Sequence, residues 1–415
     1  MAGNGSANRL LLLYTPGLDS RRLTAEHTPY IAGLLQTFPH AALTGYPSVE
    51  HLSTVITGMR PHEHGIWLAK LKSEAPPTPV QRLIDTLPDI VTTTAQCVVH
   101  AVTKSCQMGT IPPRRRRHLH FEKMKFYGRV GTQRLADELA SHGVRTSLLS
   151  ALGTDRCRYV FTDRFVDRDW LLNTAGTGEC ALEIVQFHAL DILEHWHLET
   201  PEEFHDYYGH VDAFVRRFHE RCQSHGVTLV LLSDHGQEQV RRFVDLKAAL
   251  KTLEVPEDEY TVFVESMKAR FWFHTSRSRD AVMAYLSRSQ DGVMVSYQDM
   301  HRYLVEFPTR EFGEVYFVAH PGSVFFPDDF FQPVVNLYFG LKEWQKRRRL
   351  TRPILRGQHG YLPMHPSEQG LMAVLDQRYT VDPRGMELRD VAPSLLGLLG
   401  EPIPAFMKGT ARFRR

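Results

Sequence analysis

The pattern of apolar and polar stretches along the chain predicts buried strands that alternate with amphipathic helices. Residues 9–14 and 227–232 form short apolar runs, and each run ends in a loop sequence, TPG (residues 15–17) and SDHG (residues 233–236). Runs of this kind are typical of parallel strands that are buried on both faces of a sheet. We therefore predict two central strands, each followed by a loop at its carboxyl end.

The segments between these runs have the spacing of helices. Residues 133–142 and 204–225 are predicted to be helical, and apolar residues of the second segment recur at helical spacing: Tyr208, Val211, Phe214, Val215 and Phe218. Strands that alternate with helices indicate an α/β fold with a mostly parallel sheet. Such sheets bind ligands beyond the carboxyl ends of their strands, so chemistry is expected in loops 15–19 and 233–236.

The length of 415 residues is compatible with one large α/β domain that carries insertions. The segment at about 71–126 is rich in Pro, Thr and Arg, and the segment at about 255–351 is rich in aromatic residues. We therefore predict a single domain over residues 1–415, with inserted cap segments at these two places.

Composition narrows the class of protein. The content of 42% hydrophobic and 23% charged residues is that of an ordinary globular protein, and a formal charge of +2 gives no global attraction to nucleic acid. No stretch approaches the ~20 apolar residues that a membrane span needs. The five cysteines have no CxxC spacing, which argues against a thiolate zinc site. We expect a cytoplasmic protein without a membrane segment or a stable nucleic-acid complex; the oligomeric state stays open.

Three placements of carboxylates and imidazoles suggest a metal site. Asp191 and His195 are four residues apart, a spacing that places both on one face of a helix or across a tight loop. Asp234 and His235 emerge together at the carboxyl end of a predicted strand, before a glycine. His359 lies in the sequence GQHG, where glycines let the backbone approach a ligand closely.

A fourth stretch carries a specific resemblance. Residues 45–58 read GYPSVEHLSTVITG, and Arg60-Pro61 and then a His-Gly pair follow. This stretch resembles the nucleophile region of the type I phosphodiesterase/nucleotide pyrophosphatase branch of the alkaline phosphatase superfamily. By this resemblance Ser48, ten residues before Gly58, takes the place of the residue that attacks phosphorus.

The remaining motifs of that family occur here in the family's order. They are Asp-x-x-x-His at residues 191–195, Ser-Asp-His-Gly at 233–236, Gly-x-His-Gly at 357–360, and a closing helix and turn at 390–404. The resemblance spans nearly the whole chain and implies an alkaline phosphatase-like three-layer α/β fold.

The resemblance also implies a ligand set and a reaction. One divalent metal would be held by Asp191, His195 and His359, and a second by Ser48, Asp234 and His235. Ligands of this mix suit zinc, or alternatively manganese or iron. The implied reaction is hydrolysis of a small phosphate ester, with a nucleotide-type diester favoured, through an intermediate on the serine.

Two positions depart from the family pattern. Where the family has an Asp ligand of the second metal after the first strand, this chain has Pro16, and Asp19 lies three residues further on. The protein is therefore expected to hold one or two metals, and a catalytically impaired or phosphate-binding protein is the alternative to an enzyme.

The second departure replaces an Asn that binds a phosphate oxygen by His51. We predict a substrate-binding role for His51, with capping or packing at a helix start as the alternative. His64 and His188 are expected to have structural roles.

Overall fold

The computed structural model describes most of the chain. The described residues are 8–47, 51–67, 69–71, 78–88, 91–92, 94–95, 98, 119–121, 124, 126, 128–198, 201–256, 258–325, 356–382 and 384–415. Ser48, most of the predicted insertion at 71–126 and the last part of the one at 255–351 lie outside them.

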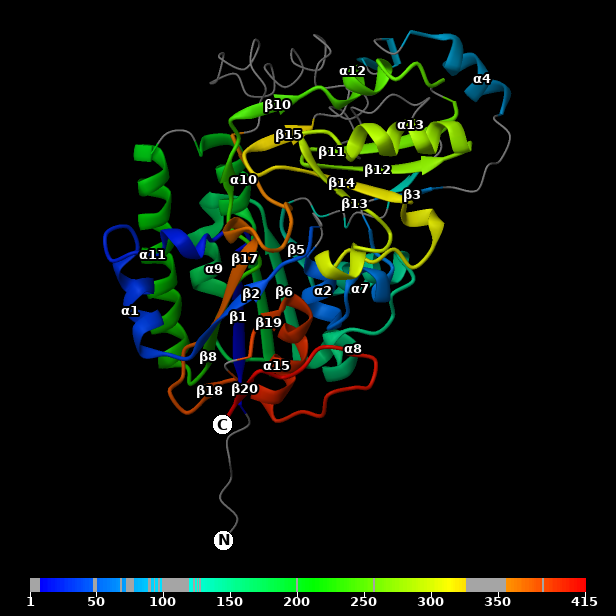
Figure 1. Cartoon of the computed structure of the whole chain (residues 1–415). Helices are drawn as coiled ribbons and strands as arrows, with labels where there is room; N and C mark the ends of the chain where they lie inside the picture. Colours follow the sequence, from blue (N-terminus) through cyan, green and yellow to red (C-terminus); the bar gives the residue numbers. More distant parts are fainter. Residues whose placement is uncertain are drawn as a thin grey trace.

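An eight-stranded sheet forms the centre of the molecule (Figure 1). Across the sheet, the strands follow the order β19 (Met386–Glu387), β2 (His40–Thr44), β17 (Gln369–Val374), β8 (Thr228–Ser233), β1 (Leu10–Tyr14), β7 (Leu182–Phe187), β6 (Cys157–Thr162) and β5 (Val130–Gly131). Neighbours from β8 to β6 pair in parallel, and Leu12 lies opposite Ile184 on one side and Val230 on the other. The sheet is mostly parallel, as predicted.

The first strand shows why the centre needs continuous apolar runs. Successive side chains of a strand point to opposite faces, and both faces of β1 are covered. Leu10 and Leu12 belong to one hydrophobic core, whereas Leu11 and Leu13 belong to the other. A strand buried on both sides cannot alternate apolar with polar residues.

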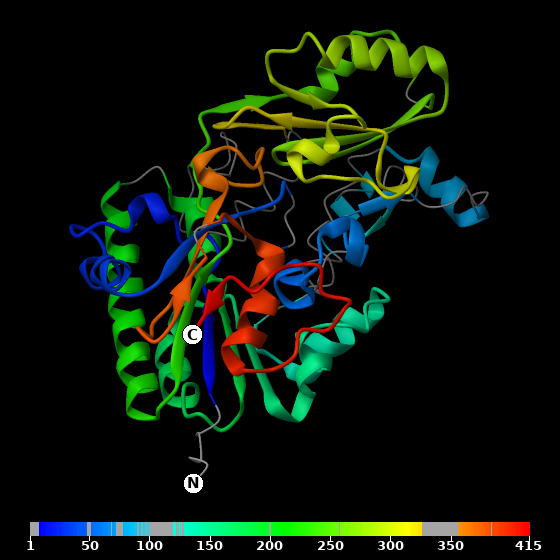
Figure 2. The same cartoon turned by 60° about the horizontal axis from the view of Figure 1, so that its bottom comes forward.

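Helices form the two outer layers (Figure 2). One core contains residues of α1 (Pro29–Thr37), α9 (Arg168–Thr174), α10 (Ala189–His197) and α11 (Pro201–Ser224). The opposite core contains residues of α2 (Leu52–Thr57), α7 (Thr132–Ser141), α8 (Leu148–Leu152) and α15 (Val391–Leu399). The result is the three-layer α/β architecture expected from the sequence.

The individual predictions agree with these elements to within a few residues. Strands predicted at 9–14 and 227–232 are β1 and β8, and helices predicted at 133–142 and 204–225 are α7 and α11. All five apolar residues that were chosen on α11 by their spacing are buried in the same core.

A second, antiparallel sheet lies beside the upper end of the central sheet in Figure 1. Its strands are β11 (Tyr260–Glu265), β12 (Lys268–Phe273), β14 (Val315–Ala319) and β13 (Gly292–Val295), and α12 (Leu246–Lys251) and α13 (Ser276–Leu286) share a core with it. We call it the small sheet. It falls within the predicted insertion at 255–351, and the single-domain organisation stays a prediction.

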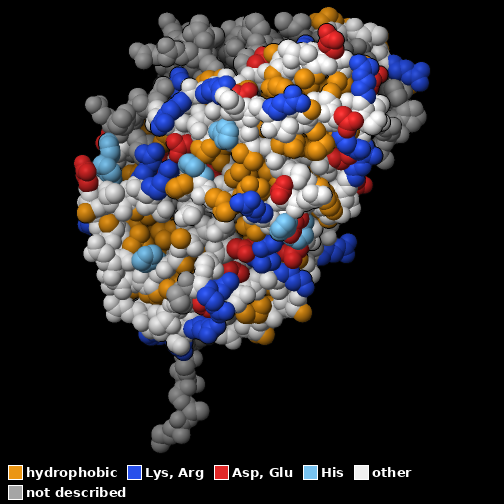
Figure 3. All heavy atoms as spheres, viewed as in Figure 1, with side chains coloured by type: hydrophobic (Ala, Val, Ile, Leu, Met, Phe, Trp, Pro, Cys, Tyr) orange, Lys and Arg blue, Asp and Glu red, His pale blue; other side chains and the backbone are white. Residues whose placement is uncertain are grey.

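Short elements connect these parts. They are α3 (Pro61–His64), α4 (Pro79–Thr86), and the strand pairs β3 (Ala69–Leu71) with β4 (Leu119–Phe121), β9 (Glu238–Gln239) with β16 (Gly357–Gln358), β10 (Arg242–Val244) with β15 (Ser323–Phe325), and β18 (Thr380–Val381) with β20 (Phe413–Arg414). On the face shown in Figure 3, Lys and Arg side chains are interspersed with Asp and Glu. None of the helices within the described residues is both long and apolar enough to cross a membrane.

Candidate metal centre

Three neighbouring strands direct the candidate residues to one edge of the central sheet. Strands β8, β1 and β7 are adjacent and parallel, so their carboxyl ends lie together. Asp234 and His235 follow β8 directly, and α10, which carries Asp191 and His195, follows β7 after a single residue. His359 and His51 also reach this edge, and the six side chains form two clusters. Ser48 lies outside the described residues.

The first cluster consists of Asp191, His195 and His359. Asp191 and His195 occupy one face of α10, as their spacing predicted, and His195 Nε2 lies 3.6 Å from Asp191 Oδ2. His359 Nε2 lies 3.5 Å from the other carboxylate oxygen, Asp191 Oδ1. Two imidazoles therefore face one carboxylate, each at its own oxygen.

A close approach of backbones places His359 beside α10. A side chain at Gly357 would put its Cβ 2.6 Å from the carbonyl oxygen of Glu194, so only glycine fits there. Because the Gly357 backbone lies this close to α10, its carbonyl accepts a hydrogen bond of 2.8 Å from His195 Nδ1. The bond orients the His195 ring so that Nε2 faces Asp191.

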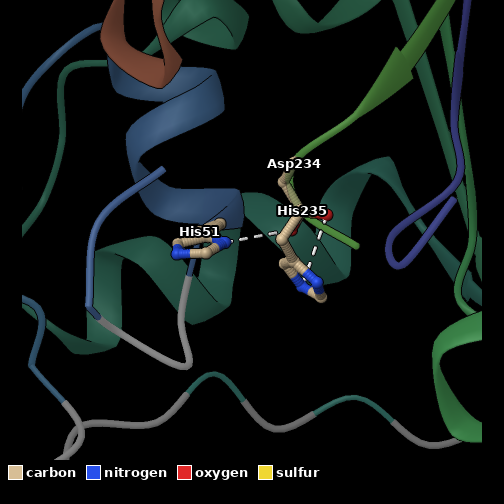
Figure 4. A group of neighbouring side chains, drawn as sticks. All are labelled: His51, Asp234 and His235. Atoms are coloured by element: carbon tan, nitrogen blue, oxygen red, sulfur yellow. Dashed lines mark hydrogen bonds and ion pairs between the residues drawn. The ribbon is translucent and has the colours of Figure 1, made fainter. Parts of the chain in front are cut away.

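The second cluster consists of His51, Asp234 and His235, drawn in Figure 4. His51 Nδ1 lies 3.1 Å from Asp234 Oδ2, and His235 Nε2 lies 3.4 Å from Asp234 Oδ1. The phenol of Tyr14, the last residue of β1, donates a hydrogen bond of 2.6 Å to Asp234 Oδ2. All three members of the cluster are buried.

The two clusters are in direct contact. The rings of His235 and His359 are stacked with centroids 3.5 Å apart and planes 8° from parallel. The two clusters therefore meet at this pair of stacked imidazoles. Together they form one polar centre at the carboxyl ends of the strands.

Both carboxylates are held in the ionised form. Burial by itself would raise the pKa of Asp234, but the nearby His235, His51 and Tyr14 outweigh burial and lower that pKa. Burial acts in the same direction on Asp191, and His195 and other imidazoles again reverse its effect and lower the pKa. Two buried anions in one centre call for compensating positive charge.

His359 has the opposite electrostatic environment. Burial, together with the neighbouring rings of His235 and His195, lowers its pKa well below the usual value. The ring is therefore neutral at neutral pH, which is the form of histidine that binds metals.

The residues present fit a divalent cation. Among the side chains that the structure describes, Asp234 Oδ1 and His359 Nδ1 are buried without a hydrogen-bond partner. In each cluster the potential ligand atoms lie within 4.8 Å of one another. Two imidazoles and one carboxylate form a ligand set that zinc takes while keeping a further position open for water or substrate.

The end of β1 does not supply a ligand. The side chain of Pro16 has no donor atom for a metal, and Asp19, the nearest carboxylate after it, belongs to neither cluster. Arg21 binds both oxygens of the buried Asp19 carboxylate at 2.7–3.1 Å. The same carboxylate packs against Gly236, where an added Cβ would lie 2.5 Å from Asp19 Cγ. Asp19 therefore does not replace the carboxylate that Pro16 lacks.

Several residues around the clusters were not identified from the sequence. Gln237 donates a hydrogen bond of 2.7 Å to Asp191 Oδ1, and His188 Nε2 lies 3.3 Å from Asp191 Oδ2. The position of His188, three residues before Asp191 at the start of α10, could have indicated this contact. His64, by contrast, has the expected structural role, because Thr54 and the backbone of Ile66 occupy its two ring nitrogens.

The small sheet reaches the centre through the residue before Ser48. Lys268 Nζ donates a hydrogen bond of 3.0 Å to the carbonyl of Pro47, and the Tyr316 hydroxyl donates to the same oxygen. Both side chains are buried. This contact could not be predicted from a local pattern, because Pro47 and Lys268 are 221 residues apart.

Comparisons with known proteins agree with this architecture. The model of the family described as type I phosphodiesterase/nucleotide pyrophosphatase matches residues 10–361. No curated protein sequence matches the chain significantly.

Solved structures of ectonucleotide pyrophosphatase/phosphodiesterase 5 have a similar fold. The mouse protein, an inactive variant in complex with AMP, has a TM-score of 0.56 and 12% identity, with 96% of each chain covered. The human protein has a TM-score of 0.55 and 14% identity, with 97% of each chain covered.

Proposed function

Because the chain belongs to the type I phosphodiesterase/nucleotide pyrophosphatase family of phosphoric ester hydrolases, we propose that it hydrolyses nucleotide-type phosphodiesters with the help of divalent metal ions. The observation that carries the proposal is the pair of clusters, each with two imidazoles and a carboxylate, at the carboxyl ends of neighbouring strands. The AMP bound to the mouse protein of similar fold supports a nucleotide as the substrate.

The metal ligands in this proposal are the residues named from the sequence. Asp191, His195 and His359 hold one ion, and Asp234 and His235 contribute to a second. Divalent ions bound there, zinc first among them, would lower the pKa of a nearby hydroxyl and neutralise charge on the attacking and leaving oxygens.

The nucleophile in this proposal is Ser48. Its neighbours in the chain support the assignment, because the carbonyl of Pro47 is bound by the small sheet and His51 is bound by Asp234. Pro47 and His51, the described residues that flank Ser48, are therefore both held by hydrogen bonds, and His51 is a member of the second cluster. The serine oxygen would attack phosphorus and displace the alcohol of the diester, which leaves with a proton, to give a phosphoseryl intermediate. Water would then attack the same phosphorus, break its bond to the serine oxygen and release the phosphate product.

One observation favours the alternative, a phosphate-binding protein with impaired catalysis. Strand β1 ends without a carboxylate ligand, since Pro16 follows Thr15. In that case the fold would be kept for binding, and neither cluster would need to hold a metal tightly.

The experiment that separates these functions combines metal analysis with turnover. Elemental analysis of the purified protein is followed by hydrolysis assays with a nitrophenyl phosphodiester and a nitrophenyl monoester, for the wild type and Ser48→Ala. Bound metal, turnover of the diester and its loss in Ser48→Ala support the hydrolase. Absence of metal and of turnover, even after metal is added, would refute it and leave the binding protein.

A further inference from the structure

His51 is placed like a ligand and not like a helix cap. It occupies the position before α2, yet its side chain makes no capping hydrogen bond. The ring is instead buried and directed at Asp234, as Figure 4 shows. The capping role that the sequence left open is therefore absent.

The hydrogen bonds of His51 determine which ring nitrogen carries the proton. His51 Nε2 lies 3.0 Å from the carbonyl oxygen of Tyr46, and a carbonyl only accepts, so Nε2 is the donor. In the neutral ring the lone pair is then on Nδ1, which faces the Asp234 carboxylate at 3.1 Å. A lone pair that faces a carboxylate is unfavourable unless a positive charge lies between them.

His235 repeats this arrangement on the other oxygen of Asp234. Its Nδ1 lies 2.9 Å from the carbonyl of Gly236, so Nδ1 is the donor there, and Nε2 faces Asp234 Oδ1 at 3.4 Å. The rings of His51 and His235 are 5.4 Å apart. Each imidazole thus turns the nitrogen that its backbone hydrogen bond leaves free toward one oxygen of Asp234. One divalent cation satisfies both lone pairs and the carboxylate together.

We propose that His51 is a metal ligand of the second cluster. This rests on the proposed function and assigns His51 a role other than the phosphate contact expected from the sequence. Both clusters then have the same donor set, two imidazoles and one carboxylate. The second site takes its third ligand from the start of α2, while β1 contributes only the Tyr14 hydrogen bond to the ligand Asp234.

A buried histidine nearby shows what a purely structural role looks like. Both ring nitrogens of His64 have protein partners, with Nε2 3.1 Å from Thr54 Oγ1 and Nδ1 accepting from the Ile66 amide at 3.0 Å. No carboxylate faces either nitrogen in these contacts. His51 has one nitrogen in a backbone hydrogen bond and the other at a carboxylate, which is the pattern of metal-binding histidines.

The first test is a zinc titration of the metal-free protein by calorimetry, with bound metal counted by elemental analysis. The variant His51→Asn keeps an amide that can donate to Tyr46 and removes the imidazole. We expect the wild type to bind about two equivalents. In His51→Asn the ion of the second cluster should bind more than ~100-fold more weakly, while the ion of the first cluster keeps its Kd.

Two further variants serve as controls. His195→Asn should weaken binding at the first cluster instead of the second. His62→Asn, which alters a partly exposed residue paired with Glu306, should leave binding at both clusters unchanged. If His51→Asn binds two equivalents with wild-type affinity, or the wild type binds only one, the proposal is wrong.

The second test needs no variant and so does not depend on whether His51→Asn folds. X-ray absorption of the zinc-loaded wild type counts imidazoles per metal ion, and we expect an average of about two if His51 binds and about one and a half if it does not. A wild type that binds no divalent metal refutes the metal dependence of the proposed function as well. A wild type with two ions and the lower imidazole count refutes only the role of His51.

Discussion

The two clusters contain the same donor types but are assembled differently. In the first, Asp191 and His195 come from adjacent turns of one helix, and His359 comes from a loop held against that helix. In the second, Asp234 and His235 are consecutive, and His51 comes from a segment 183 residues earlier in the sequence. The first cluster therefore depends mainly on α10, whereas the second depends on how distant segments pack.

The two clusters also differ in how deeply they are buried. The second cluster is fully buried, and the neighbouring Pro47 is bound by the small sheet. In the first cluster, His195 is partly exposed. Substitutions at the Pro47 contact should therefore affect the second cluster more than the first, in which only His359 comes from a loop that packs on the small sheet.

The largest effect is expected from removing either carboxylate charge. Asp191→Asn and Asp234→Asn should each lose one metal equivalent and lower kcat/KM for a nitrophenyl diester by on the order of 10³-fold, because a metal contributes several kcal/mol to the reaction. Asp212→Asn is the matched control, since Asp212 is buried but binds the start of α1. A variant of either cluster with normal turnover would show that its cluster is not catalytic.

The next effect concerns the buried Lys268 in the small sheet. Burial lowers its pKa from 10.5 to about 8, although Glu265 opposes the shift. The unfolded state then binds more protons than the folded state between pH 8 and 10.5, so stability rises with pH in that window. Between pH 8 and 10.5, the free energy of unfolding of the wild type should rise by up to about 3 kcal/mol more than that of Lys268→Met. Urea denaturation at several pH values measures this, and parallel curves for the two proteins would contradict it.

A smaller effect should distinguish the clusters through their supporting hydrogen bonds. Tyr14→Phe removes the donor to Asp234, and Gln237→Leu removes the donor to Asp191. Each should weaken metal binding about 10–100-fold in its own cluster only, as expected for groups that orient metal ligands. Zinc titration of both variants makes each the control of the other. Equal weakening of both equivalents in one variant would mean that the clusters are not separable.

The smallest effect is expected from one hydrogen bond between the small sheet and the nucleophile segment. Tyr316→Phe removes a donor to Pro47 and should destabilise the protein by about 1 kcal/mol while lowering hydrolysis and leaving the first metal equivalent unchanged. Tyr361→Phe is a matched control, because the Tyr361 hydroxyl donates to the carbonyl of Ser323. It should lose similar stability without losing activity. Equal activity of the two variants would indicate that the Pro47 contact does not position the segment.

The sequence predicted what depends on local pattern. Strands β1 and β8 were identified because burial on both faces requires continuous apolar runs, and the register of each determines where its loop emerges. Asp191, His195, Asp234 and His235 could be selected as candidates because residues next to a strand end or on one helix face leave a spacing in the sequence, and the structure brings them into two clusters.

Contacts between distant segments could not be predicted in this way. The ring of His51 meets Asp234 across 183 residues of sequence, and nothing near His51 in the sequence encodes that partner. Lys268 lies in a strand whose apolar neighbours indicate burial but not what its ammonium group binds. Such contacts are set by tertiary packing, for which a single sequence has no local signal.

The stacked rings of His235 and His359 decide which substitutions can reach both clusters. Each cluster contributes one ring to the stack, and the ring centroids are 3.5 Å apart. Packed rings at this distance leave no free space between them, so a change of volume at one ring must displace the other. Substitutions at His235 or His359 should therefore disturb both clusters, whereas Tyr14 and Gln237 lie outside the stack and should each act on one cluster.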